Sequence, residues 1–321
     1  MTIAKAGKHS TSAPNANKQP LRVTLYNQRY IFLMLTPALI LAALFIYRPF
    51  IYLWVAFTHY RLGFPVFSGT WNNFASFRAF FADTMDGWDV IRNTLQMNIT
   101  TLFVNLLSAM VFAILLNEVR IKFAKSLVQV FTLFPFFVSW VITYSLFNAI
   151  FAVNTGLLNN FLLRHGIISQ GINILGEARF AVPLIVFANF WKALGYLTIL
   201  FLAAIAGIDQ EQYESADMDG ASRLQKMWYI TAPSLLPTLG VLFVLFSGSI
   251  FNSNFEQFFM FTNPTNRPRM LVFDMYIFEQ GLRMGRISYA TAAGLVRSFM
   301  ALGTLLLVNL INKKLSGNSV F

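Results

Sequence analysis

The sequence predicts an all-α, polytopic membrane protein with about six transmembrane helices. Hydrophobic residues make up 56% of the 321 residues and charged residues only 12%, whereas soluble domains have ~45–50% and ~25%. Aromatic residues add 16%, which is more apolar surface than compact cores bury. The chain has no Cys, which excludes disulfide scaffolds, thiolate metal sites and cysteine nucleophiles. An integral membrane protein is the class that fits these numbers.

Six apolar stretches are long enough to cross a bilayer, because a spanning helix needs ~20 apolar residues. They are Ile31–Phe57, Ile91–Leu116, Ser126–Phe151, Phe180–Ala206, Leu235–Phe251 and Tyr289–Ile311. The first is too long, and its polar leader too extended, for a secretory signal peptide. We expect residues 1–28 to form a flexible cytoplasmic tail and residues 29–321 a transmembrane domain.

The basic surplus predicts the orientation of the chain. It holds 24 Lys and Arg against 13 Asp and Glu, a net charge of +11, but the cations are scattered, which argues against nucleic acid as a partner. Their density is highest in the N-terminal tail, in the short loop 117–125 and at the C-terminus. Short basic loops stay in the cytoplasm, so both termini are predicted to be cytoplasmic.

The loop 207–234, on the same side, is predicted to contain two short helices. Asp209 and Ser222 each precede a Gln by three residues, the pattern of a capping box. Gly220 supplies the break between the helices, because a residue after a helix end often needs a positive φ. Pro233 is expected to end the second helix.

Two uses fit this helical loop. One is an amphipathic hairpin that lies on the membrane surface or on the protein's own helices. The other is a knob that enters a groove on a cytoplasmic partner, where the carboxylate of Glu214 would accept the fork of an arginine.

A motif in the loop combines a Glu-Ser-Ala string, an Asp-Gly-Ala string two residues later and a downstream Pro. Its residues are Glu214, Ser215, Ala216, Asp219, Gly220, Ala221 and Pro233. The motif resembles the EAA loop of permeases of type I, binding-protein-dependent ATP-binding cassette (ABC) importers, in the sugar and oligosaccharide branch. Ser215 stands where that family usually has Ala, and Ala232 where it has Leu.

The resemblance extends from about residue 28 to the C-terminus, through LFPFFVSWVITYSLF, NFWKALGYLTILFLAAIAGI and ISYATAAGLVRSFM. Within the branch it is to permeases for complex oligosaccharides and polysaccharide fragments, the larger permease of alginate importers among them. It implies a bacterial inner-membrane location, a second, homologous permease, two ATPase subunits and an extracytoplasmic solute-binding protein.

The resemblance also implies roles in coupling. Glu214 would meet an ATPase arginine, Gly220 would form an obligatory turn, and Asp219 would act as a local cap. The chain has no G-x-x-x-x-G-K-[ST] motif, so we expect ATP and Mg²⁺ to be bound by the partner ATPases and no cofactor by this chain.

Polar and aromatic side chains in or beside the crossings are candidates for a substrate path, because such groups are costly in lipid. They are Tyr144, Asn189, Trp191, Lys192, Tyr196, Asn252, Glu256 and Arg297. Hydrogen bonds between helices are the alternative role for each, as for Asn98 and Asn105. The two cations would suit an acidic sugar such as an alginate fragment, whereas a neutral sugar would need aromatic rings and amides.

Catalysis and metal binding are not predicted. The three His residues are dispersed, and neither H-E-x-x-H nor G-x-S-x-G occurs. The rival function is a secondary transporter or channel for a small polar solute, which predicts inverted repeats and broken helices in place of a cytoplasmic knob. A membrane-embedded enzyme would need clustered His or acidic residues.

Overall fold

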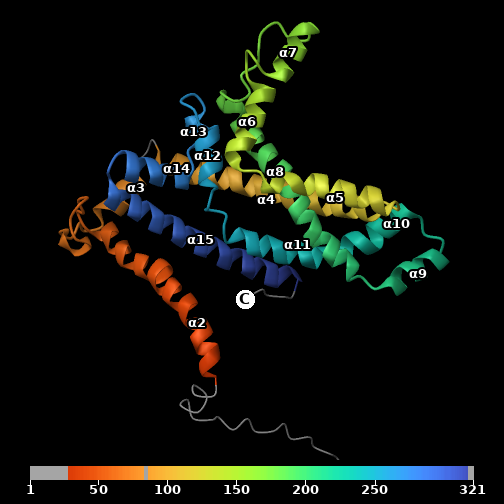
Figure 1. The fold of residues 1–321 in the computed structure, drawn as a ribbon, viewed down its shortest axis with the longest axis horizontal. Helices are drawn as coiled ribbons and strands as arrows, with labels where there is room; N and C mark the ends of the chain where they lie inside the picture. The colour runs from red at the N-terminus through yellow and green to blue at the C-terminus, as the bar shows by residue number, and fades with distance from the viewer. Residues whose placement is uncertain (1–27, 83–85, 317–321) are drawn as a thin grey trace, which may run out of the picture. The chain divides into compact units, whose positions relative to one another are not determined.

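The computed structural model describes residues 28–82 and 86–316, and the predicted tail lies outside them apart from Gln28. Within these ranges the chain forms helices and loops but no β-strand (Figure 1). The helices are α2 (Arg29–Ala42), η1 (Ala43–Tyr47), η2 (Arg48–Phe57), η3 (Val66–Ser68), α3 (Ala75–Ala82), α4 (Gly87–Asn117), α5 (Lys122–Phe137), α6 (Trp140–Phe151), α7 (Leu157–Arg164), η4 (Ala178–Phe180), α8 (Ala181–Ala206), α9 (Gln210–Met218), α10 (Arg223–Lys226), η5 (Met227–Thr231), α11 (Ala232–Ser247), α12 (Phe255–Phe261), α13 (Arg267–Met270), α14 (Phe273–Phe278), η6 (Glu279–Arg283) and α15 (Ile287–Ser316). The chain divides after Tyr52 into two compact units.

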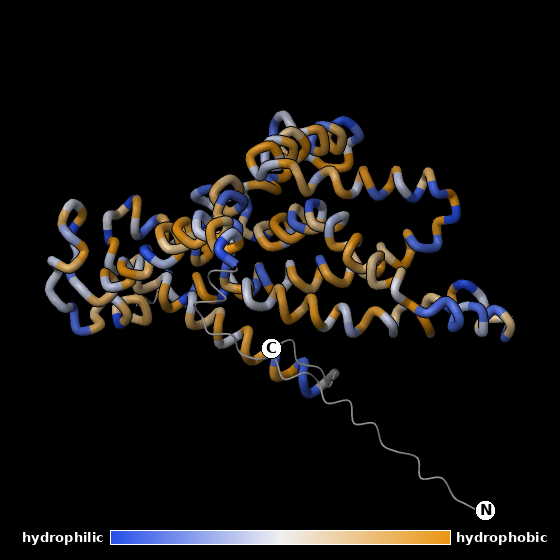
Figure 2. Tube along the Cα trace, turned by 60° about the horizontal axis from the view of Figure 1, so that its bottom comes forward, coloured by the Kyte–Doolittle hydropathy of each residue, from blue (hydrophilic) through white to orange (hydrophobic). Residues whose placement is uncertain are grey.

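Five helical segments of the described chain are long and apolar enough to cross a membrane, and a bent pair of helices would make a sixth. They overlap the predicted stretches, although the helix that holds the fifth runs over Arg223–Ser247 rather than Leu235–Phe251. The overlap confirms the all-α, polytopic fold. Large apolar side chains stay exposed along the long helices, and in Figure 2 polar residues gather in the segments that join them. Such continuous apolar surface is unfavourable in water, whereas lipid accommodates it.

The third predicted crossing, Ser126–Phe151, is not one straight helix but a bent pair of helices. α5 and α6 meet at 106°, where Pro135 supplies no N–H and Ser139 caps the new helix with its side-chain oxygen. Lys192 of α8 donates from Nζ to the carbonyl of Pro135 at 3.1 Å and to that of Val138. The bend is possible because a side chain from another helix satisfies backbone groups that lipid would leave unpaired.

Pro233 does not end a helix, so that prediction is wrong. The predicted second loop helix and the fifth crossing form one continuous helix, Arg223–Ser247. A π-turn, η5, precedes Pro233, and there the N–H of Ala232 donates to the carbonyl of Met227. This wider turn displaces the hydrogen-bond register before the proline, so the missing N–H does not interrupt the helix.

The second unit is built around α4 and α8, which pack along each other. One cluster of buried side chains joins these two helices to α11 and includes Leu106, Phe201 and Leu235. A second cluster includes Phe80, Phe273 and Tyr276 and joins α3 to α14. Figure 1 shows α9 projecting at the end of this bundle where α4 and α8 terminate.

Ion pairs join three segments at the opposite end of α4. Arg267 donates from Nη2 to Glu279 at 2.7 Å and approaches Asp86, just before α4, at 3.5 Å. The hydrogen bond with Glu279 raises the pKa of Arg267 against the opposing effect of burial. The network ties α13 and η6 to the start of α4.

Gly195 allows α5 to approach α8 closely. A Cβ atom at this position would lie 2.3 Å from the carbonyl oxygen of Thr132 on α5, and small residues at such contacts are how membrane helices pack backbone to backbone.

Gly195→Ala should therefore destabilise the protein by about 1–3 kcal/mol, the usual cost of overpacking. Thermal unfolding in detergent measures the effect. Gly303→Ala is the matched control, because no neighbouring heavy atom lies within 4 Å of a Cβ there. Equal melting temperatures for the two variants would contradict this account of the α5–α8 contact.

Candidate functional site

The loop between α8 and α11 forms a pre-shaped helical hairpin. Gly220 adopts φ +73°, a conformation that favours glycine, and turns the chain from α9 into α10. The predicted capping box is confirmed at Ser222, whose Oγ accepts from the N–H of Gln225 while the Gln225 side chain accepts from the N–H of Ser222. Asp209 also caps α9, but through the N–H of Glu211, and no reciprocal bond from Gln212 is present among the described residues.

Six of the seven motif residues lie together on this hairpin, and Pro233 lies in the first turn of α11. Glu214, Ser215, Asp219, Gly220 and Pro233 are exposed, while Ala216 and Ala221 are half-buried. Within the described chain the Glu214 carboxylate makes no hydrogen bond or ion pair. It is thus available to a partner molecule.

Two polar contacts brace α9 against the helix that leads into α11. The hydroxyl of Tyr213 lies 2.8 Å from Oγ1 of Thr231, which is buried at 2% exposure. Lys226 pairs with Asp217 at 2.6 Å. Because both contacts bridge the two arms of the hairpin, a displacement of α9 carries the start of the long helix with it.

The hairpin also exposes large apolar side chains, namely Met218, Leu224, Trp228 and Tyr229. Aromatic residues and Met are enriched where proteins meet other proteins. Together with the unpaired Glu214 they give the hairpin the character of a docking surface.

Tyr213→Phe should loosen α9 while leaving α11 intact, since it removes one hydrogen bond, worth about 1 kcal/mol. We expect amide hydrogen exchange in α9 to become about fivefold faster. Tyr229→Phe is the control, because the Tyr229 hydroxyl has no partner among the described residues and its side chain is 79% exposed. Unchanged exchange in Tyr213→Phe would show that the brace does not hold α9.

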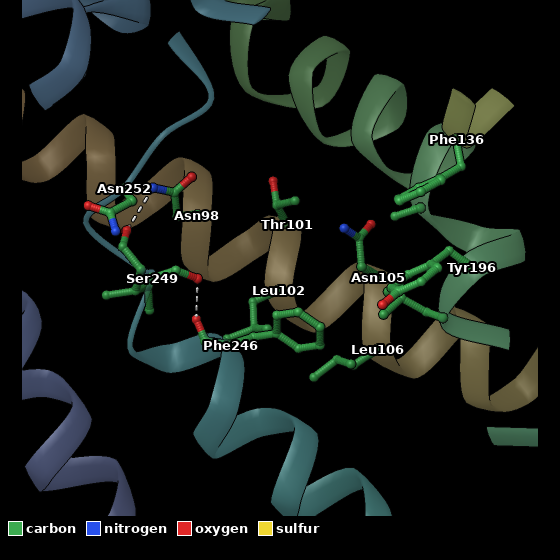
Figure 3. Close-up of a pocket in the computed structure, with 13 residues that line it drawn as sticks. Asn98, Thr101, Leu102, Asn105, Leu106, Phe136, Tyr196, Phe246, Ser249 and Asn252 are labelled. Carbon is green, nitrogen blue, oxygen red and sulfur yellow. Dashed lines mark hydrogen bonds between the residues drawn. The ribbon is translucent and has the colours of Figure 1, made fainter. Parts of the chain in front are cut away.

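A cavity of about 280 Å³ lies between α4, α5, α8 and the end of α11. Its labelled lining residues in Figure 3 are Asn98, Thr101, Leu102, Asn105, Leu106, Phe136, Tyr196, Phe246, Ser249 and Asn252. None of the lining residues is charged. The cavity lies within the apolar spans, where a polar lining is costly unless it serves a purpose.

The cavity combines amides with a pair of aromatic rings. Phe136 and Tyr196 stack with centroids 4.7 Å apart and planes 10° from parallel. Asn98 donates to the carbonyl of Ile250 at 2.7 Å, whereas the buried Oδ1 of Asn105 has no partner in the described chain. Rings and amides of this kind can contact the faces and hydroxyl groups of a sugar.

Of the eight predicted path residues, only Tyr196 and Asn252 line this cavity. The two cations are engaged elsewhere, Lys192 at the α5–α6 bend and Arg297 in an ion pair with Asp274.

The four remaining path candidates also lie outside the cavity lining. Tyr144 packs on Phe261 with ring centroids 5.1 Å apart, and Trp191 lies beside Phe147. Asn189 donates to the side-chain oxygen of Gln257 at 2.8 Å. Glu256 is exposed at the start of α12.

The sequence alone did not single out Thr101, Phe136 and Ser249 as residues of the cavity. It also did not single out the contact between Tyr213 and Thr231, which joins the two arms of the hairpin. Thr101 and Ser249 are polar residues in apolar segments, so the rule applied to the other path candidates would have found them. The same rule would have found Asp274, which lies in the apolar segment LVFDMYIF. The pairing of Tyr213 with Thr231 left no local signal.

A family model described as "Binding-protein-dependent transport system inner membrane component" matches residues 105–317. The chain belongs to this family, and the predicted type I importer permease fold and inner-membrane location are confirmed.

Two relatives in Bacillus subtilis (strain 168) match most of the chain. Protein LplB is 37% identical over 92% of each chain. The polygalacturonan/rhamnogalacturonan transport system permease protein YteP is 33% identical over 95% of this chain and 94% of its own.

Two solved structures are also similar. A bacterial ABC transporter involved in the import of the acidic polysaccharide alginate matches with a TM-score of 0.82 and 30% identity, covering 92% of this chain and 99% of that chain. A bacterial alginate ABC transporter in complex with an alginate pentasaccharide-bound periplasmic protein matches with a TM-score of 0.83 and 31% identity, over 94% of this chain and 99% of that chain.

Proposed function

We propose that this chain is a permease subunit of an ABC importer that moves an oligosaccharide across the inner membrane. The observation that carries the proposal is the structural similarity to a chain of an alginate transporter. The match has a TM-score of 0.82 and covers 92% of this chain and 99% of the transporter chain. The uncharged cavity supports the same function, because it offers rings and amides to a sugar.

The proposed assembly contains a second, homologous permease, two ATPase subunits and an extracytoplasmic solute-binding protein. The family description and the periplasmic protein in one similar structure support it. Both termini and the hairpin would face the cytoplasm. ATP and Mg²⁺ would be bound by the ATPases, since this sequence lacks a P-loop motif.

Movement of the ATPase subunits would be transmitted to the cavity through one helix. In this scheme the carboxylate of Glu214 accepts hydrogen bonds from an ATPase arginine, and α9 moves with the ATPase dimer. The contacts of Tyr213 with Thr231 and of Asp217 with Lys226 carry that movement into the helix Arg223–Ser247. Phe246, near the end of this helix, lines the cavity. Closure and opening of the ATPases would thereby switch the side on which the cavity opens.

An acidic oligosaccharide is the substrate class we favour. A relative is named for polygalacturonan/rhamnogalacturonan transport, and a similar structure for the acidic polysaccharide alginate. The cavity presents no charge, so we expect this chain to contact ring faces and hydroxyls rather than carboxylates. Lys192 and Arg297 keep the roles of structural cations in the conformation described.

The bent α5–α6 pair is a broken helix, a feature that we expected from a secondary transporter. A broken helix therefore does not distinguish an importer permease from a secondary transporter, because this chain has the bend and belongs to the importer family. The hairpin with its unpaired Glu214 favours the importer.

Glu214→Ala should lower sugar transport by at least tenfold in reconstituted vesicles, because it removes the carboxylate that would anchor α9 to the ATPase. Stimulation of ATP hydrolysis by the binding protein should fall with it. Glu211→Ala is the matched control, since it removes the same charge one turn earlier on α9. Normal transport in Glu214→Ala would disprove the coupling role.

Tyr196→Ala and Asn105→Leu should each weaken transport of alginate or polygalacturonan oligosaccharides about fivefold, as expected from the loss of one contact. Initial uptake rates at low substrate concentration report the effect. Leu107→Ala, an exposed position on α4 outside the cavity lining, should have no effect. If all three variants transport equally, the cavity is not on the path.

A further inference from the structure

A second cavity, of about 370 Å³, lies behind the hairpin, where α4 and α8 end. Three of its lining residues are cations, Arg120, Arg223 and Lys226, and one is the carboxylate Glu118. The other lining residues are Asn117, Val119, Ile205, Ala206, Gln210 and Tyr213. The cavity is thus shared between the loop after α4 and the hairpin.

Two of the cations are uncommitted. Lys226 is paired with Asp217, but neither Arg120 nor Arg223 makes a hydrogen bond or ion pair with any residue that the structure describes, and both are exposed. Guanidinium groups bind phosphate through two parallel hydrogen bonds. Since Arg120 and Arg223 come from different segments, one phosphate between them would link the hairpin to the bundle.

The surroundings of the cavity are apolar as well as basic. Val119, Ile205 and Ala206 line it, and Ile121 follows Arg120 with 68% of its surface exposed. The cavity also lies at the ends of two membrane-spanning helices, Gly87–Asn117 and Ala178–Ala206, which is the depth of lipid headgroups.

We propose that this cavity binds the phosphate of an anionic phospholipid headgroup, held between Arg120 and Arg223. Basic pockets between transmembrane helices on the cytoplasmic side suit such headgroups, and the position of the cavity at the ends of two spans favours a lipid over free phosphate. The cytoplasmic placement rests on the proposed orientation of the chain, but lipid binding does not depend on transport. A bound headgroup restrains the hairpin from the side opposite the ATPase.

The test uses the purified complex in detergent, titrated with short-chain phosphatidylglycerol, with phosphatidylcholine of the same chain length, and with inorganic phosphate. A ligand that binds the folded protein raises its melting temperature, which yields an apparent affinity. We expect phosphatidylglycerol to stabilise the wild type. Arg120→Gln and Arg223→Gln should each weaken its apparent affinity about fivefold, and the double variant about thirtyfold.

Lys122→Gln is the control, because it removes an exposed cation from the same loop region outside the cavity lining and should bind like the wild type. Melting temperatures without lipid check that every variant folds, and native mass spectrometry counts the phosphatidylglycerol molecules retained.

Several results would overturn the proposal: equal stabilisation by phosphatidylcholine, an equal effect of inorganic phosphate, a wild-type affinity in the double variant, or a cavity that the docked ATPase closes to lipid. Loss of transport in any of these variants would not bear on the lipid site.

Discussion

The rest of the fold depends on how the α5–α6 bend satisfies its backbone in lipid. Lys192 donates to the carbonyls at the break, and its ammonium lies 4.9 Å from the centroid of the Trp140 ring. Gly195, one turn further along α8, lets α5 approach. The next residue, Tyr196, then stacks on Phe136. One turn of α8 therefore stabilises the bend and builds one wall of the cavity.

The second organising element is the uninterrupted helix from Arg223 to Ser247. Its first turns belong to the hairpin and its last residues lie beside the cavity, so a contact made in water is mechanically joined to a site within the membrane. A stop at Pro233 would have placed a flexible joint in this connection. The π-turn keeps the helix continuous, and the half-buried hydrogen bond between Tyr213 and Thr231 joins α9 to it.

Much of this architecture could be predicted from local signals. The spans follow from apolar length, and the turn at Gly220 and the cap at Ser222 follow from side chains a few residues apart. The continuity through Pro233 could not, because it depends on a π-turn before the proline. The bend and the Arg297–Asp274 pair could not either, because each depends on a partner distant in sequence. For the same reason Lys192, predicted on the path, turned out to hold carbonyls of another helix. The motif of the loop was recognisable because most of its residues lie close together in the sequence.

The exposed apolar residues of the hairpin have a consequence for the life of the subunit before assembly. Met218, Leu224, Trp228 and Tyr229 are exposed on the chain by itself, and an apolar surface of this kind promotes aggregation until a partner covers it. An orphan copy would therefore be a substrate for chaperones and proteases, which act on such surfaces. The surface that we propose couples this chain to its ATPases would also make the amount of this subunit follow the supply of its partners.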